Sequence, residues 1–227
     1  MRLYQPRRGY RFSIDSILLG RFCGARAGER VLDLGAGCGI VSLMIAALGH
    51  PREIVAIEMQ PALAAIAVRN AALNHFDDMR VICADLEALS ASETGGEFDL
   101  VVANPPFRAR QTGRESPDTG RRIARTETTA TLAGFVAAAA RNTRRGGRAA
   151  FVLAAERSAE LLSALRSAAL EPKRVRFVHP FATARASVIL VEARKGGGIE
   201  VEIEAPLMLY TAPGVYTAEA LALMGAA

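Results

Sequence analysis

The sequence predicts an α/β fold built on a doubly wound, mostly parallel sheet of seven strands. Three observations lead to this prediction. Short apolar segments typical of strands alternate with longer segments typical of helices. A glycine-rich loop follows the first expected strand, and Glu, Asp or Asn follows each of the next three. The length of 227 residues fits one domain. We therefore expect a single domain over residues 1–227, with residues 1–28 as a short basic N-terminal arm.

The first half of the chain carries the clearest alternation. Its expected helices begin at a serine that suits an N-cap, at the end of the glycine loop, and at a proline that suits the first helical turn. Glycine and proline close the second of them. The expected helices are residues 13–22, 40–48 and 61–74. The expected strands are residues 30–34, 54–57, 80–83 and 98–103.

The second half begins with a polar segment, residues 108–127, which contains Gly and Pro and predicts a loop. At about 20 residues it exceeds an ordinary connection, so we expect it to be functional. Helices are predicted for residues 132–141 and 157–170. Strands are predicted for residues 147–153, 175–179 and 187–193, with one more allowed by residues 199–203.

Composition excludes several classes of protein. With 51% hydrophobic and 22% charged residues, a disordered chain is excluded. No window approaches the 18 or so continuous apolar residues of a membrane span, and the first ten residues lack the apolar core of a secretory signal. The three cysteines are widely spaced and unpaired, so neither a disulfide framework nor a metal site is expected. We expect a cytoplasmic protein without a membrane or metal partner.

Positive charge is concentrated in two segments. The net charge is +5, yet residues 104–148 contain ten arginines against three acidic residues, and residues 1–11 contain four arginines and no acid. The rest of the chain is acidic overall. Arginine replaces lysine almost throughout, which reflects coding bias, but bias does not explain clustering. Clustered arginines typically neutralise phosphates, so the pattern predicts a polyanionic partner.

The loop after the first expected strand reads Asp33-Leu-Gly-Ala-Gly-Cys-Gly39. Its glycine spacing differs from the G-x-G-x-x-G of a dinucleotide site. Glycines allow close approach of a ligand, and Asp33 favours a cation over a pyrophosphate. Glu58, after the second strand, suits ribose hydroxyls, and Asp85, after the third, suits an adenine amino group. An ammonium cation, a ribose and an adenine together describe S-adenosylmethionine, the cofactor we expect.

The fourth expected strand ends in Asn104-Pro-Pro-Phe107. An exocyclic amine conjugated to an aromatic ring is a poor nucleophile. The side-chain carbonyl of Asn104 and the backbone carbonyl of Pro105 can accept its two N–H bonds and direct its lone pair at a methyl group. Pro105 and Pro106 stiffen the turn because proline fixes φ and lacks an N–H. Phe107 offers a stacking face worth roughly 1–3 kcal/mol per base. We expect these four residues to be catalytic.

With these motifs the chain resembles Rossmann-like, S-adenosylmethionine-dependent methyltransferases that act on amino groups conjugated to π systems. Within that class it is similar to the tRNA1(Val) adenine-N6 methyltransferase family. That family begins with Gln, then Gly-Tyr-(Arg or Lys)-Phe-(Ser or Thr)-x-Asp and an apolar helix; here the segment is Gln5-Pro-Arg-Arg-Gly9-Tyr-Arg-Phe-Ser13-Ile-Asp15. The resemblance implies methylation of adenine N6 in tRNA, and it implies that Ser13 and Asp15 lie near the methionine end of the cofactor.

Two departures from the family pattern are visible. Most members have Tyr after Asn-Pro-Pro, whereas Phe107 lacks the hydroxyl and keeps only the stacking face. The loop of residues 108–127 matches loosely. Expected cofactor-binding residues are Ser13, Asp15, Asp33, Gly35, Gly37, Gly39, Glu58, Met59, Asp85, Leu86 and Asn104. Expected RNA-binding residues are Arg7, Arg8, Arg11, Arg108, Arg110, Arg121, Arg122 and Arg125.

Three alternatives stay open. Ribosomal RNA guanine-N2 methyltransferases also carry Asn-Pro-Pro-Phe and act on an exocyclic amine. Protein glutamine-N5 methyltransferases use Asn-Pro-Pro-Tyr, but they resemble longer chains with a helical N-terminal domain, and only about 28 residues precede the first expected strand here. A protein that binds S-adenosylmethionine without turnover is the third, although intact Asp33 and Asn104 argue against it.

Overall fold

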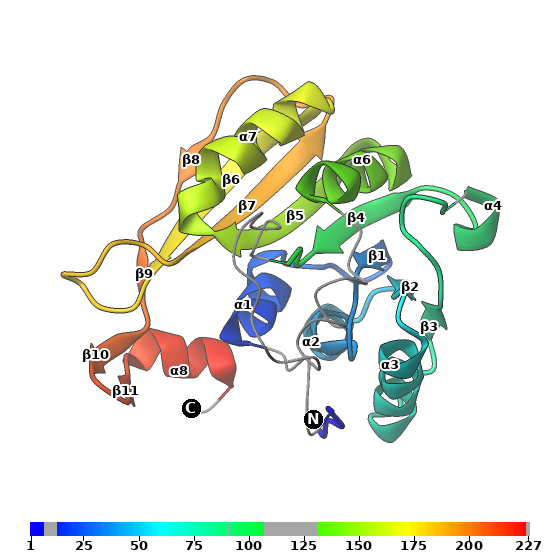
Figure 1. The fold of residues 1–227 in the computed structure, drawn as a ribbon, viewed down its shortest axis with the longest axis horizontal. Helices are drawn as coiled ribbons and strands as arrows, with labels where there is room; N and C mark the ends of the chain where they lie inside the picture. Colours follow the sequence, from blue (N-terminus) through cyan, green and yellow to red (C-terminus); the bar gives the residue numbers. More distant parts are fainter. Residues whose placement is uncertain (7–12, 90, 107–130, 226–227) are drawn as a thin grey trace, which may run out of the picture.

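The computed structural model describes residues 1–6, 13–89, 91–106 and 131–225. Most of the strands belong to one sheet that helices cover on both faces (Figure 1). The strands of that sheet are β1 (Arg30–Leu34), β2 (Glu53–Ile57), β3 (Met79–Ile82), β4 (Phe98–Ala103), β5 (Thr143–Ala154), β6 (Leu170–His179), β7 (Val188–Lys195), β8 (Glu202–Ile203) and β9 (Leu207–Met208). A separate hairpin consists of β10 (Tyr210–Ala212) and β11 (Val215–Tyr216).

The strands follow the order β3-β2-β1-β4-β5-β7-β6-β8, and β9 also pairs with β6. Neighbours among β1 to β5 are parallel, whereas β7 is antiparallel to both β5 and β6. The chain moves outward from β1 to β3 and then crosses back to β4, which creates a topological switch point where such sheets bind ligands. The expected doubly wound, mostly parallel sheet is confirmed, and two two-residue strands, β8 and β9, extend it beyond the expected seven.

The sheet divides the apolar core into two layers, and helices cover both of its faces. On one face, apolar side chains of α1, α2 and α8 pack together, and on the other those of α6 and α7 do so (Figure 1). Because both faces are covered, the central strands are buried almost throughout, as the burial of four of the five β1 residues illustrates. The helices are α1 (Ile14–Phe22), α2 (Ile40–Gly49), α3 (Pro61–Leu73), α4 (Ala91–Thr94), α6 (Leu132–Asn142), α7 (Ser158–Ser167) and α8 (Ala218–Met224), with a 3₁₀ turn, η1 (Ala155–Arg157).

The beginning of the chain is attached to α3 by two asparagine side chains. Asn70 exchanges two hydrogen bonds with the backbone of Tyr4 (2.7 and 2.9 Å), and Asn74 does the same with the backbone of Arg2 (2.8 and 2.7 Å). The expected basic arm is therefore docked on the domain over its first residues. Its residues 14–22 form α1, which packs into the core against α2 and α8. The single-domain assignment itself stays a prediction.

Among the described residues, no helix combines the length and apolar character needed to cross a membrane.

Candidate active site

The residues predicted to be functional follow strands that end level with one another. Leu34, the last residue of β1, pairs with Ile57 of β2 and with Ala103 of β4, and the last residue of β3 pairs with that of β2. Neighbouring strands lie about 4.8 Å apart. The start of the glycine loop, Glu58 and Asn104 are therefore brought to one edge of the sheet, within roughly two strand spacings of each other, at the switch point.

The glycine loop turns sharply between β1 and α2. Gly35, Gly37 and Gly39 all have positive φ angles (71°, 58° and 84°), a region that other L residues rarely adopt. A Cβ on Gly35 would lie 3.0 Å from two ring atoms of Phe135 in α6. The loop is also fixed by backbone hydrogen bonds, among them one from the Ala36 N–H to the Ile57 carbonyl (2.9 Å). Backbone conformation thus favours glycine at all three positions, and packing also favours it at Gly35 and Gly39.

Asp33 is buried in β1 and joins the strand to α2. Its Oδ2 accepts hydrogen bonds from the Ser42 hydroxyl (2.6 Å) and the Ser42 N–H (3.2 Å). The pKa of the Asp33 carboxyl is raised to about 6, chiefly by burial and to a smaller extent by the nearby Glu58 carboxylate, against the hydrogen bonds from Ser42. The geometry thus gives Asp33 a role in holding the loop and helix together. Its expected contact with a cofactor cation stays a prediction.

The Glu58 side chain forms a direct hydrogen bond with the glycine loop. Its Oε2 accepts the Gly37 N–H (2.8 Å), and its Oε1 accepts the Gln60 N–H at the start of α3 (2.8 Å). The side chain is buried. A carboxylate oxygen can accept more than one hydrogen bond, so both oxygens keep capacity for ribose hydroxyls. Met59, which follows it, is half-buried.

Asp85 and Leu86 lie just beyond the end of β3. Asp85 is half-buried, and its Oδ1 accepts the Glu87 N–H (2.9 Å), which shapes the turn. Leu86 is buried and packs in the layer that includes α6. An acceptor next in sequence to an apolar side chain at this edge suits an adenine amino group and ring.

Asn104 follows β4 and is oriented by α1. Its side-chain Nδ2 donates a hydrogen bond to the Ser16 hydroxyl (3.0 Å), and Ser16 is 1% exposed. Because the amide nitrogen is directed at α1, the Asn104 carbonyl oxygen points away from that partner and is the acceptor that remains. Ser16 was not among the expected site residues.

The start of α1 brings Ser13 and Asp15 to the same edge. The Ser13 hydroxyl donates to Asp15 Oδ2 (2.6 Å), and burial raises the pKa of the Asp15 carboxyl although this hydrogen bond opposes the shift. Ser13 stands at the N-cap position, yet its side chain makes no capping hydrogen bond. Both residues lie within one helical turn of Ser16 and hence near Asn104.

The two prolines after Asn104 differ in exposure: Pro105 is buried and Pro106 is exposed. The Pro106 carbonyl accepts a hydrogen bond from Arg157 Nη1 in η1 (3.5 Å). The turn after β4 is therefore in contact with η1, which follows β5. Phe107 and all of the expected RNA-binding arginines lie outside the described residues: Arg7, Arg8, Arg11, Arg108, Arg110, Arg121, Arg122 and Arg125.

Sequence reasoning also missed Ser42 and Asn70. Ser42 supports Asp33, as described above. Asn70 is fully buried in α3, and besides holding Tyr4 its Nδ2 donates to the Cys38 carbonyl in the glycine loop (2.8 Å). The available signal was a lone polar residue on the apolar face of a predicted helix. No group of three His, Cys, Asp or Glu side chains within the described ranges is placed to hold a metal ion.

A family model agrees with this arrangement. The model of the methyltransferase small domain matches residues 15–170, which include the glycine loop, Glu58, Asp85 and Asn104. The chain belongs to the methyltransferase small domain family. The match begins at Asp15, so it covers α1 except for its first residue, and Ser16 lies inside the matched range.

Curated relatives of this family member support the more specific resemblance. The tRNA1(Val) (adenine(37)-N6)-methyltransferase of Dickeya chrysanthemi is 32% identical over 190 residues, which cover 82% of this chain and 74% of that protein. The enzyme of the same name from Porphyromonas gingivalis is 33% identical over 158 residues, 66% of this chain and 61% of that protein. The chain spans about three fifths of the length of this and other curated relatives that it matches.

A solved structure shares the fold of this methyltransferase small domain. The crystal structure of a predicted O-methyltransferase from Agrobacterium tumefaciens superposes with a TM-score of 0.72 at 22% identity, covering 93% of this chain and 96% of that one. The Rossmann-like architecture expected from the sequence is thereby confirmed.

Proposed function

We propose that this chain transfers a methyl group from S-adenosylmethionine to an exocyclic amino group of a nucleobase, and specifically to N6 of an adenine in tRNA. The observation that carries the proposal is the orientation of Asn104. Its amide nitrogen is held by buried Ser16, which leaves its carbonyl as an acceptor at the switch point, beside the glycine loop and Glu58. We expect the protein to act in the cytoplasm.

The residues around the switch point fit S-adenosylmethionine. A loop with three positive-φ glycines offers backbone without side chains, Glu58 keeps acceptor capacity for a ribose, and Asp85 with Leu86 offers an acceptor and an apolar surface for an adenine. Asp15 supplies a carboxylate for the ammonium group. When bound, S-adenosylmethionine supplies an electrophilic methyl group on a sulfonium ion.

The chain's own residues prepare the acceptor amine. The Asn104 carbonyl and the Pro105 backbone carbonyl accept its two N–H bonds and weaken conjugation of the lone pair with the ring. Pro105 and Pro106 keep these acceptors fixed, and the Arg157 contact with the Pro106 carbonyl braces the turn. Rate acceleration then comes from orientation and preorganised electrostatics. With the cofactor bound, the methyl group would pass from its sulfur to the amine nitrogen, the neutral thioether would leave, and the nitrogen would release its proton to solvent without a dedicated base.

Two observations support RNA as the substrate. The arginines of residues 1–11 and 108–125 concentrate positive charge before and after the motif in the sequence, as phosphate binding requires. Relatives with identities above 30% are named tRNA1(Val) (adenine(37)-N6)-methyltransferases. Together with the Asn104 geometry, these favour an adenine in tRNA over the other acceptors.

The test is transfer of labelled methyl from S-adenosylmethionine to separate fractions of unmodified tRNA, ribosomal RNA and protein. Label in tRNA supports the proposal. Label confined to ribosomal RNA favours a guanine-N2 methyltransferase, and label confined to protein favours a glutamine-N5 methyltransferase. Cofactor binding without transfer to any fraction would leave a non-catalytic binding protein.

A further inference from the structure

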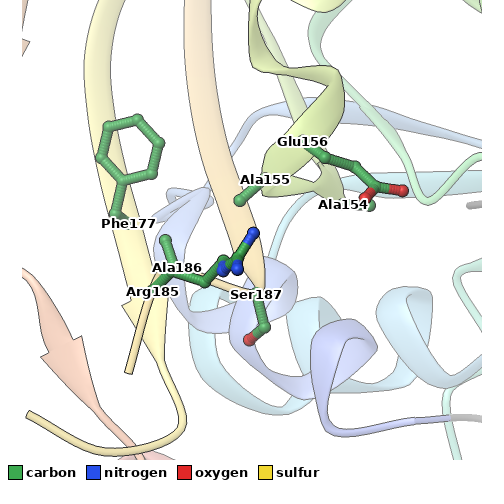
Figure 2. A pocket seen from close by; sticks show the side chains of 7 residues that line it. All are labelled: Ala154, Ala155, Glu156, Phe177, Arg185, Ala186 and Ser187. Carbon is green, nitrogen blue, oxygen red and sulfur yellow. The ribbon is translucent and has the colours of Figure 1, made fainter. Parts of the chain in front are cut away.

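A recess lies beside the candidate active site, at the ends of β5 and β6 and the start of β7. Its volume is about 510 Å³, within the range of small-molecule and cofactor sites. Phe177 of β6 lines one side, Glu156 of η1 lines the other, and the Arg185 side chain lies between them (Figure 2). The remaining lining residues are Ala154, Ala155, Ala186 and Ser187.

This recess lies on the opposite side of Asn104 from the expected cofactor site. In the sheet order, β1, β2 and β3 lie to one side of β4, and β5, β7 and β6 lie to the other. Ala103 at the end of β4 pairs with Phe151, and β5 continues for three residues to Ala154. At about 3.3 Å per residue, the recess begins roughly 10 Å beyond the end of β4. The Arg157–Pro106 hydrogen bond connects its wall to the Asn-Pro-Pro turn.

The lining chemistry suits a nucleotide. Phe177 is half-buried and offers a ring on which a base can stack. Arg185 is exposed and forms no ion pair with any other described residue, so its guanidinium is available for a phosphate. Glu156 adds an exposed carboxylate that can accept the N–H groups of a base. An aromatic ring, a cation and an acceptor in one recess match the base, the phosphate and the N–H groups of a nucleotide.

We propose that this recess binds a nucleotide one or two positions from the target adenine in the same RNA strand. The inference rests on the proposed function. A base that reacts at its exocyclic amine must leave the stack, which also unstacks its neighbours. A surface that stacks a neighbouring base on Phe177 and holds its phosphate at Arg185 recovers part of that unfavourable free energy and positions the target base at Asn104.

The first test compares Arg185→Ala with Arg145→Ala, which removes the same charge from an exposed position near the start of β5, at the other edge of the sheet. Affinity for unmodified tRNA is measured at several salt concentrations. Loss of one phosphate contact to a single strand should flatten the slope of log affinity against log salt by about 0.7. We expect this change for Arg185→Ala and none for Arg145→Ala, with cofactor affinity unchanged in both.

The second test uses Phe177→Leu and a stem-loop RNA with a single abasic nucleotide at each of two positions on either side of the target. Leucine keeps apolar packing against the core but removes the ring. With the unsubstituted chain, one abasic position should raise the KM for RNA at least about fivefold, as expected for loss of one stacked base. With Phe177→Leu, the same abasic position should have no further effect. The abasic series with the unsubstituted chain needs no variant to fold.

The outcomes separate the two proposals. Methylation of RNA with equal salt slopes for Arg185→Ala and Arg145→Ala, and no sensitivity to any abasic position, overturns the nucleotide subsite and leaves the proposed function standing. No methylation of RNA by the unsubstituted chain, with label in protein instead, overturns both. A flattened slope together with one sensitive position supports both.

Discussion

The hydrogen bond between Ser16 and Asn104 gives the sharpest prediction. Ser16→Ala removes the hydroxyl that accepts from Asn104 Nδ2 at 3.0 Å and leaves the rest of α1 in place. The Asn104 amide then loses the partner that fixes its orientation, and its carbonyl is no longer held toward the acceptor amine. We expect methyl transfer to slow while cofactor binding is retained.

The structure sets the size of this effect. A hydrogen bond contributes roughly 0.5–1.5 kcal/mol net, and a buried group left without a partner loses about 1–3 kcal/mol. Ser16 is buried but Asn104 is only half-buried, so water can partly replace the hydroxyl and about 1–2 kcal/mol is expected. If this energy is lost in the transition state, kcat falls about 5- to 30-fold. The free energy of unfolding should fall by about 1 kcal/mol, because alanine is the better helix former by only a few tenths of a kcal/mol and offsets part of the lost hydrogen bond.

The assay is steady-state methyl transfer to tRNA, together with calorimetric titration of S-adenosylmethionine and thermal denaturation. Ser42→Ala is the matched control, because Ser42 is also a fully buried helical serine but bonds to Asp33 beside the glycine loop. It should weaken cofactor binding, whereas Ser16→Ala should lower kcat. Unchanged kcat in Ser16→Ala, or equal losses of cofactor affinity in both variants, would refute the positioning role of Ser16.

Three further predictions follow from the neighbouring contacts. Asp33 retains its proton in the folded state up to pH about 6, whereas the ordinary pKa of an Asp carboxyl is 3.8. The free energy of unfolding should therefore fall by at most about 3 kcal/mol as the pH rises from 3.8 to about 6, and Asp33 should cause no further change at higher pH. Urea unfolding of Asp33→Asn should lack this decline, and an unchanged difference from the unsubstituted chain between pH 4.5 and 7 would contradict the assignment. Gly35→Ala puts an alanine at a positive φ of 71° and places its Cβ 3.0 Å from the Phe135 ring. Thermal denaturation should show a loss of about 1–3 kcal/mol in the free energy of unfolding, and titration should show weaker cofactor affinity. Wild-type stability and wild-type affinity would contradict this prediction. Asn70→Ala removes the hydrogen bonds to Tyr4 and Cys38. Limited proteolysis should therefore cut the first residues of this variant faster than those of Asn74→Ala, which retains both contacts. Equal rates of cleavage would refute the larger role of Asn70.

Much of the fold could be predicted because strong apolar periodicity is local. β1, β2 and β4 have the expected bounds to within one residue, since each is a compact apolar segment between turn signals. β5 begins at Thr143 and β6 at Leu170, four and five residues earlier than expected. Each extension contains a residue that is unusual in strands, Gly146 in β5 and Pro172 in β6. The register of β6 against β7 shifts after Pro172, as a proline in a sheet requires.

The short elements near the end of the chain could not be predicted for a different reason. β9 and β11 are two residues long, which is too short for a period to be visible. β8 is equally short, but it lies within residues 199–203, where one more strand was allowed. α8 is apolar but short, and its N-cap, Thr217, becomes recognisable only when its hydroxyl is seen to accept the Ala220 N–H.

For the candidate site, position along the sheet was predictable and contacts were not. Glu58, Asp85 and Asn104 stand out because each follows a strand, and parallel strands bring their carboxyl ends to one edge. Ser16 lies 88 residues from Asn104 in the sequence, and a serine inside an apolar helix carries no local sign of such a partner. Arg185 lies in the connection between β6 and β7, where nothing in the sequence indicates which groups it faces.

The identity of the methylated nucleoside tests the proposed chemistry most directly. Unmodified tRNA is incubated with S-adenosylmethionine and either the unsubstituted chain or Asn104→Ala, then digested to nucleosides and analysed by mass spectrometry. We predict N6-methyladenosine from the unsubstituted chain and none from Asn104→Ala, with cofactor binding largely retained in Asn104→Ala. A different methylated nucleoside, such as N2-methylguanosine, or N6-methyladenosine formed at the normal rate by Asn104→Ala, would contradict the role assigned to the turn after β4.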